Sequence, residues 1–396
     1  MNIVGMGLPG YAYIDPTYYG GHEGLNLWTW GVNAVLADGK MRALFSMLFG
    51  ASMLLIASKA AGDSALGPIQ THYRRAFWLL VIGALHGFLL WYGDILVFYA
   101  VAGMVAFPFR KLDPRLLIAV GAAVFFGLVG WDLYEHSHRV ALHAAATAPG
   151  AAPAAIEAWQ AMLSTMGPPP ALGQADLAAF GGGFTDALQQ RSRMFVMMHT
   201  KIGHMEYVEA FGLMLLGAGL FKTGFFTLGW STGAYAAVIA AGYLICVPIT
   251  AWLAWQAAAA GLDRLDLSEF YRFSAAVRLP IAMAHASVVM LLVRAGAVRW
   301  LTERLAAAGR MALTNYIAMS LITTIIFCGF GFGLFGELQR YQLYIVVAGL
   351  WAAILLWSKP WLSRFEYGPL EWVWRSLVRW SPQPLAKGAA APAPAL

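Results

Sequence analysis

The sequence predicts an all-α, polytopic integral membrane protein, a bundle of about nine to ten transmembrane helices. Hydrophobic residues make up 60% of the 396 residues, only 12% carry a formal charge, and the mean hydropathy is +0.63. These values lie far from those of soluble globular proteins. A chain inside hydrocarbon must satisfy its own backbone hydrogen bonds, and the long apolar runs lack the two-residue alternation of a membrane β-barrel. A helical bundle is therefore the expected fold.

Each spanning helix needs about 20 mostly apolar residues. Nine runs of the sequence approach this length, and they cover residues 41–59, 74–92, 95–109, 116–132, 205–221, 233–255, 274–294, 311–329 and 341–358. The first dozen residues are apolar but too short to cross, and they lack the basic start and cleavage site of a signal peptide. They are expected to form the end of a tenth helix.

The chain divides into four expected regions. Residues 1–132 form the N-terminal membrane helices, the first of them incomplete, and residues 203–380 form a C-terminal membrane domain. Residues 133–202 are an extracytoplasmic loop rich in Ala, Pro and Gly, in which Pro153 begins a helix suited to the membrane interface. Residues 381–396 have too little apolar surface to fold and are expected to be a disordered tail.

Basic residues indicate the orientation in the membrane. If the loops alternate sides, 16 of the 26 Lys and Arg residues fall on one side, close to the ends of the spans. The positive-inside rule predicts that this side, with the C-terminus, faces the cytoplasm. Topology and contact with anionic membrane lipids then explain the net charge of +6 without a nucleic-acid partner.

The stretch LHGFLLWYGDIL, residues 85–96, places an ionisable ring inside an apolar run. His86 lies about 8 Å below the outer aromatic belt that Trp91 marks. Such a residue either bonds neighbouring helices or lines a wet cavity as a proton donor or acceptor. Asp94 either caps the next helix or lies at the mouth of that cavity. His86 and Asp94 are the candidate catalytic residues.

Arg310, Asn315 and Tyr316 lie at the cytoplasmic start of the 311–329 span and are candidate substrate-binding residues. Arg310 is either a snorkelling topology anchor or a ligand for the phosphates of a donor such as coenzyme A. Asn315 is suited to a hydrogen bond between helices.

Three further residues are candidates for substrate binding. Glu371 and Arg375 follow the last span with the i, i+4 spacing of a helical ion pair. His285, near the middle of its span, is an expected partner for His86.

Other polar and sulfur-bearing residues are expected to be structural. The segment HTKIGHME separates His199 and His204 by five residues rather than four, so no metal site is expected. Cys246 and Cys328 fall inside spans and are expected to be packing residues.

Several blocks of the sequence resemble the signature blocks of the YeiB-like family, whose C-terminal half is a domain of unknown function, DUF418. These blocks are LFSMLFGAS (44–52), RRAFWLLVIGALHGFLLWYGDILVFYAVAGMV (74–105), GLMLLGAGLFKTGFF (212–226), GRMALTNYIAMSLI (309–322) and SRFEYGPLEWVWR (363–375). Family members usually begin with a longer first helix that carries an L-D-x-L-R-G type stretch, and this sequence starts after that stretch.

The resemblance implies a multi-pass protein of the bacterial inner membrane. The family is distantly similar to transmembrane acyltransferases, which move an acyl group from a cytoplasmic thioester to an acceptor on the far side by means of a membrane-embedded His. By this analogy His86 is the reactive centre, acetyl-CoA or another acyl-CoA is the donor substrate, and no cofactor is bound. A small molecule, a glycan or a lipid-linked group is the implied acceptor. In some of these relatives the reactive His lies near the first helix; His22 is the nearest equivalent here, and it is expected to be a solvated loop residue.

Two other classes of function stay open, because kinship of fold does not fix function. A small-molecule transporter would show inverted repeats and broken helices, and the halves of this sequence show no convincing repeat. A non-catalytic scaffold would use His86 and Asp94 as structural bonds. A cavity that reaches His86 favours transfer chemistry, and a sealed bundle favours the scaffold. Helix faces of small residues also allow a homodimer.

Overall fold

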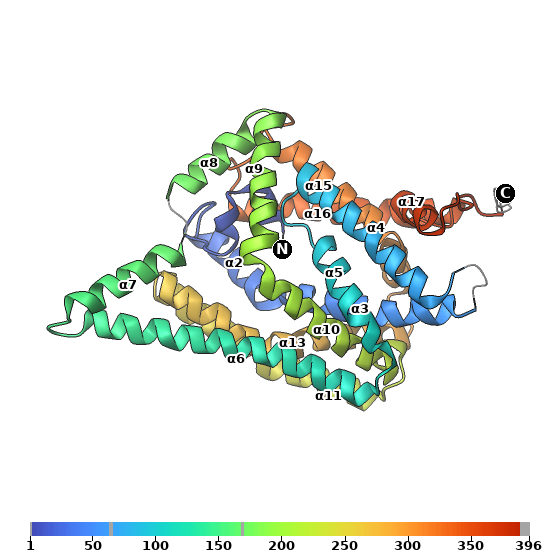
Figure 1. Ribbon diagram of the computed structural model, residues 1–396, viewed down its shortest axis with the longest axis horizontal. Helices are drawn as coiled ribbons and strands as arrows, with labels where there is room; N and C mark the ends of the chain where they lie inside the picture. Colours follow the sequence, from blue (N-terminus) through green and yellow to red (C-terminus); the bar gives the residue numbers. More distant parts are fainter. Residues whose placement is uncertain (1, 63–65, 168–169, 389–396) are drawn as a thin grey trace.

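A computed structural model describes residues 2–62, 66–167 and 170–388, and their regular elements are helices (Figure 1). The first half contains α1 (Ile3–Gly7), η1 (Gly10–Tyr13), α2 (Gly24–Leu36), α3 (Lys40–Ala60), α4 (Pro68–Leu89), α5 (Leu96–Ala106), η2 (Phe107–Lys111), α6 (Pro114–Thr147), α7 (Pro153–Met166), α8 (Pro170–Gly181) and α9 (Phe184–Met197). The second half contains η3 (Met198–Ile202), α10 (His204–Lys222), η4 (Phe225–Thr227), α11 (Thr232–Ala240), η5 (Ala241–Cys246), α12 (Val247–Ala259), α13 (Arg264–Arg294), α14 (Arg299–Arg310), α15 (Ala312–Phe327), α16 (Arg340–Arg364) and α17 (Pro369–Arg379). The predicted all-α class is confirmed.

Several of these helices have the length and hydropathy needed to cross a membrane. Five segments of the described chain qualify, namely residues 24–60, α6, residues 232–259, α13 and α16; a sixth qualifies if α14 and α15, which meet at an angle of 83°, form one broken span. Each of the nine predicted runs falls on helix. However, α5 has 11 residues and is about 16 Å long, short of a hydrocarbon core of about 30 Å. The count of nine to ten spans therefore stays a prediction.

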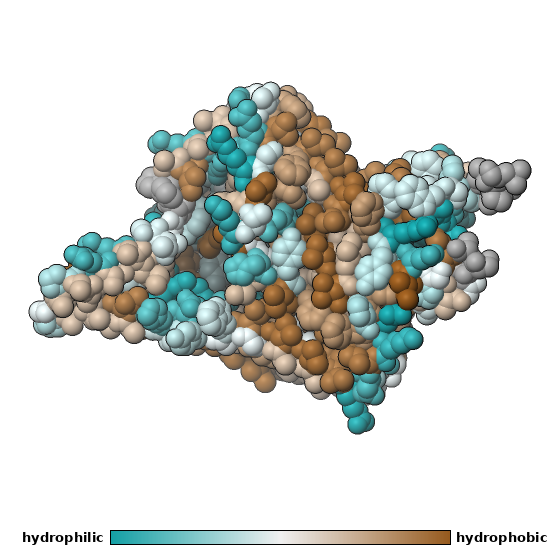
Figure 2. All heavy atoms as spheres, viewed as in Figure 1, coloured by the Kyte–Doolittle hydropathy of each residue, from teal (hydrophilic) through white to brown (hydrophobic). Residues whose placement is uncertain are grey.

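Large apolar side chains are exposed on the outside of the bundle, as a surface in contact with lipid requires. Leu244, Ile345 and Trp351 are each more than 60% exposed. Figure 2 shows apolar residues over much of one face, while hydrophilic residues lie mostly toward several of its edges. These features are those of a membrane protein.

Helix α10 forms the centre of the bundle, between α3 and α6. Small residues allow the helix backbones to approach closely. A Cβ atom on Gly50 of α3 would lie 2.0 Å from the carbonyl oxygen of Met214, and one on Gly217 of α10 would lie 2.0 Å from that of Met47. This close packing fixes the position of α3 relative to α10, and α4 and α5 both pack against α3.

The region predicted as an extracytoplasmic loop, residues 133–202, is mostly helical. Helix α6 continues past the predicted end of its span at residue 132 as far as Thr147, and the predicted helix at Pro153 is present as α7. The two form a projecting hairpin (Figure 1). The Ala-rich end of α6 has high helix propensity, which explains why the helix does not stop at the end of its most apolar stretch.

The predicted disordered tail is wrong for residues 381–388. Glu366 donates a backbone hydrogen bond to Leu385, and Lys387 donates one to Arg364. The Trp372 indole donates a further hydrogen bond to the Gln383 carbonyl. These bonds hold the segment against the end of α16 although it buries little apolar surface. Residues 389–396 of the predicted tail lie outside the described residues.

Candidate functional site

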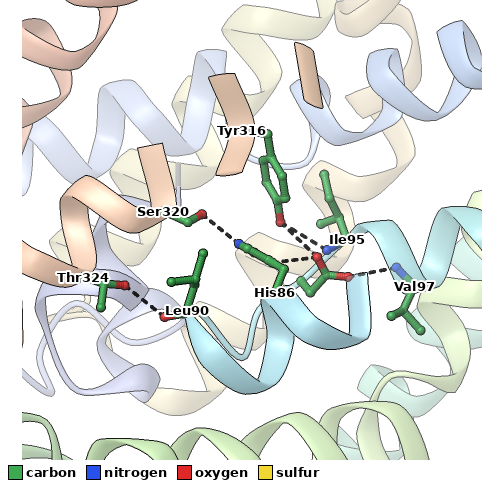
Figure 3. Close-up of polar contacts among 8 residues, drawn as sticks. His86, Leu90, Ile95, Val97, Tyr316, Ser320 and Thr324 are labelled. Carbon is green, nitrogen blue, oxygen red and sulfur yellow. Dashed lines mark hydrogen bonds and ion pairs between the residues drawn. The ribbon is translucent and has the colours of Figure 1, made fainter. Parts of the chain in front are cut away.

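The candidate site lies where the C-terminal end of α4 meets the middle of α15 (Figure 3). His86 is in the last turn of α4, and Ser320 is on α15. Between α4 and α5 the chain turns through Asp94, whose Oδ1 accepts a hydrogen bond from the backbone N–H of Val97 at 2.8 Å. The predicted capping role of Asp94 is therefore confirmed. This bond uses one carboxylate oxygen and leaves Oδ2 for the site.

Three polar side chains, those of Asp94, His86 and Ser320, form a continuous series of hydrogen-bonded contacts in the site. Oδ2 of Asp94 lies 2.7 Å from Nδ1 of His86, and Nε2 of His86 lies 2.8 Å from Oγ of Ser320. An ionised Asp94 accepts a hydrogen bond from Nδ1–H, which leaves Nε2 to accept the hydroxyl proton of Ser320. This is the order of groups that activates a serine nucleophile in Ser-His-Asp hydrolases. We call these three residues the relay.

The relay is enclosed by protein. Asp94 is 0% exposed, Ser320 1% and His86 3%. The carboxylate fits because position 83 has no side chain: a Cβ atom on Gly83 would lie 2.8 Å from Oδ1 of Asp94. Close packing of this kind holds the three groups in fixed geometry and also excludes water from them.

Tyr316, one helical turn before Ser320 on α15, completes the surroundings of the relay. Its hydroxyl lies 3.4 Å from Oδ2 of Asp94 and also 3.4 Å from the backbone nitrogen of Ile95. Its ring centroid lies 4.8 Å from that of His86. The structure thus brings three predicted site residues together, His86, Asp94 and Tyr316.

A small cavity lies one helical turn beyond the relay. Thr324 on α15 donates a hydrogen bond of 3.0 Å to the carbonyl of Leu90 at the end of α4, and both residues line the cavity (Figure 3). Its volume is about 20 Å³. This is room for about one water molecule, so the cavity cannot admit a substrate in this conformation.

The remaining candidates on α15 and α14 lie away from the relay. Asn315 donates hydrogen bonds to the Ala308 carbonyl at 3.0 Å and to Oγ of Ser358 at 3.3 Å, and it accepts one from the Trp357 indole at 3.1 Å. The predicted interhelical role of Asn315 is confirmed. Arg310 is exposed, and its guanidinium donates to the Glu366 carbonyl at 3.1 Å.

The predicted ion pair between Glu371 and Arg375 is wrong. The Glu371 carboxylate is buried at the N-terminus of α15, where it accepts hydrogen bonds from the backbone N–H groups of Leu313 and Thr314 and from the Thr314 hydroxyl. Arg375 instead lies over the ring of Tyr367, 4.3 Å from its centroid. The unpaired backbone donors of a helix start hold the carboxylate more strongly than an exposed cation does.

The predicted pairing of His285 with His86 is also wrong. His285 lies on α13, where Nδ1 is 2.6 Å from the Tyr243 hydroxyl and Nε2 is 2.8 Å from the Leu36 carbonyl. Both of its ring nitrogens have partners, and both partners belong to other helices. The partners of His86 are Asp94 and Ser320.

Sequence reasoning missed Ser320, although a signal was available. Tyr316, Ser320 and Thr324 recur every four residues in an apolar run and therefore share one helix face.

In the described ranges no group of His, Cys, Asp and Glu residues is suited to hold a metal ion. In the HTKIGHME segment, Nδ1 of His199 lies 2.7 Å from the Tyr207 hydroxyl.

Comparison with known proteins adds to this geometry. Residues 220–381 match a family described as "Protein of unknown function (DUF418)". The chain is 28% identical over 390 residues to the "Uncharacterized protein YeiB" of Escherichia coli, which covers 96% of this chain and 91% of that protein. It is 25% identical over 360 residues to the "Uncharacterized protein YxaH" of Bacillus subtilis, which covers 87% of this chain and 80% of that protein. No solved structure matches the chain. The family match contains Ser320, whereas His86 and Asp94 precede it.

Proposed function

Because this chain belongs to the YeiB-like, DUF418 family, we propose that it is a bacterial inner-membrane acyltransferase in which Ser320 carries the acyl group. The observation that supports the proposal is the unbroken chain of contacts from Asp94 through His86 to Ser320, at 2.7 and 2.8 Å. The donor is a cytoplasmic acyl-CoA, and the acceptor is an extracytoplasmic or lipid-linked group.

The proposed reaction has two steps, acylation of Ser320 and transfer of the acyl group to the acceptor. In the first step Oγ of Ser320 attacks the thioester carbonyl while its proton passes to Nε2 of His86; the carbon–sulfur bond breaks, and the leaving thiolate takes that proton. In the second step an acceptor hydroxyl gives its proton to His86 and attacks the acyl-serine ester. The serine oxygen leaves and recovers the proton, so the relay returns to its starting state.

Asp94 acts through His86. Its carboxylate fixes the ring with the proton on Nδ1 and stabilises the imidazolium that forms in each step. The hydrogen bond from Val97 holds the carboxylate itself in place. Tyr316 packs against the ring and limits its rotation.

Arg310 is the proposed contact for the donor. Its guanidinium is exposed at the bend between α14 and α15, so phosphate oxygens of coenzyme A can approach it in pairs. Binding of acetyl-CoA to the purified protein, compared with Arg310→Ala, tests this part. The exposed Arg299 at the other end of α14 is the matched control, and we expect only the Arg310 variant to bind more weakly. Equal affinity of Arg310→Ala and the wild type would remove Arg310 from the site.

One observation favours a second candidate function, a structural one. The relay is sealed and both nitrogens of His86 are bonded, as in a polar link between helices. The acyl-transfer proposal therefore requires α15 or α4 to move so that the thioester reaches Ser320. The scaffold requires no movement and no turnover.

Consumption of acetyl-CoA by the purified protein, followed as released thiol, separates the two functions. We expect Ser320→Ala and His86→Gln to lower the rate by on the order of 10³-fold. His285→Gln removes an interhelical histidine whose partners, Tyr243 and Leu36, lie outside the relay, and it serves as the control with an unchanged rate. If the wild type consumes no acetyl-CoA while His86→Gln lowers the unfolding temperature and the amount of protein in the membrane, the scaffold function is the correct one.

A further inference from the structure

Arg191 on α9 is a charged side chain in the protein interior. Its residue is 1% exposed, and it is among the largest fully buried side chains of the described chain. Its guanidinium donates to the Leu89 carbonyl at 2.9 Å and to the thiol sulfur of Cys328 at 3.2 Å. The rings of Phe180 and Phe330 lie within 6.0 Å. An arginine stays protonated under such conditions, so a full positive charge is buried here.

Two other buried cations of the described chain have carboxylates nearby. Lys40 lies close enough to Asp38, and Arg340 close enough to Asp15, for the acidic charge to stabilise the basic one. The charge of Arg191 meets no carboxylate; the group that stabilises it is the Cys328 thiol. Leu89 lies at the C-terminal end of α4, whose dipole supplies roughly half a negative charge. Cys328 likewise caps the C-terminal end of α15, so the dipoles of two helices partly stabilise the charge, but Arg191 forms no ion pair within the described chain.

The cavity of about 20 Å³ is lined by this guanidinium. Part of the lining is apolar, with Met6, Phe180 and Phe335. Its polar side chains include no carboxylate and are those of Thr324, Trp91, Tyr92, Arg191 and Cys328. The Trp91 indole and the Tyr92 hydroxyl reach the Gly5 carbonyl only at 3.3 and 3.4 Å, so neither is held by a short bond. Donors of this kind suit an acceptor without protons of its own.

We propose that this cavity binds one monovalent anion of about the size of chloride, with Arg191 as its charged ligand. The volume holds one water-sized particle and excludes phosphate or a carboxylate. A water molecule would fill the same space but would bring no negative charge to Arg191, which has no ionised partner in the described chain, and this favours the anion. The inference does not depend on acyl transfer.

Thermal unfolding of the full chain in detergent tests the proposal, with chloride replaced stepwise by gluconate at constant ionic strength. An anion that binds only the folded state raises the unfolding temperature by about 3 °C at a concentration a hundredfold above its Kd. We expect this dependence in the wild type and expect it to be absent in Arg191→Gln. The exposed Arg193 on the same helix is the matched control, and Arg193→Gln should keep the dependence.

A second measurement does not rely on a variant that folds. Crystals of the wild type grown in bromide should show an anomalous scattering peak beside Arg191. Absence of the peak together with an unfolding temperature that is equal in chloride and gluconate overturns the proposal.

Discussion

Replacement of Glu371 by alanine should destabilise the protein through the start of α15, not through a lost ion pair. The carboxylate accepts hydrogen bonds from the N–H groups of Leu313 and Thr314 at 2.7 and 3.1 Å, and it is buried. The variant leaves these two donors without a partner. At about 1–2 kcal/mol for each orphaned donor, the expected loss is about 3 kcal/mol.

This loss converts into a measurable change of temperature. An unfolding entropy of about 2.1 cal/mol/K per residue over 396 residues gives a fall of about 4 °C. A thiol-reactive fluorophore in detergent is a suitable assay, because Cys246 and Cys328 are both buried and become reactive on unfolding.

Arg375→Ala is the matched control. Arg375 is exposed and lies over Tyr367, so its loss should cost less than about 1 kcal/mol. If the two variants lowered the unfolding temperature equally, Glu371 would act by pairing with Arg375, and the capping account would be wrong.

Two further predictions concern packing and pH. Gly50→Ala should destabilise the protein by about 3 kcal/mol in the same assay, because its Cβ atom would lie 2.0 Å from the Met214 carbonyl. Gly31→Ala is the control: a Cβ atom there would have no atom within 4 Å, so this variant should be neutral or stabilising. Equal effects of the two variants would refute the close approach of α3 and α10. Burial raises the pKa of Asp176 above 3.8, against the opposing effect of its hydrogen bonds from Gly10 and Gln190. The stability that this residue contributes is therefore present below its unfolded-state pKa and is lost as pH rises through its folded-state pKa. The unfolding temperature of the wild type should fall relative to Asp176→Asn as pH rises above about 4, and a difference that grows in the opposite direction would contradict the raised pKa.

Sequence reasoning predicts the fold well here because burial in lipid imposes simple rules. Apolar runs locate most of the long helices, although they miss α2 and α9, and the cost of a buried imidazole directs attention to His86. The capping role of Asp94 can be predicted because the residue lies just before the start of a helix. These inferences depend on local composition and on distance along the chain, which the sequence contains directly.

The partners of buried polar groups are harder to predict, because they depend on which helices meet. Ser320 is 234 residues from His86, and the Thr314 hydroxyl reaches Glu371 over 57 residues. An i, i+4 rule detects Arg375 as a partner for Glu371 because it considers one helix at a time. Likewise, the position of Arg191 in a loop-like region gives no indication that α9 folds back against α4.

The central claim is that Ser320 becomes acylated with His86 as its base, and mass spectrometry of the peptide that contains Ser320 tests it most directly. The protein is incubated with acetyl-CoA, quenched in acid and digested. We expect an acetyl group on Ser320 in the wild type and none in His86→Gln. A wild type that consumes acetyl-CoA but carries the acetyl group on another residue, or on none, would contradict the account.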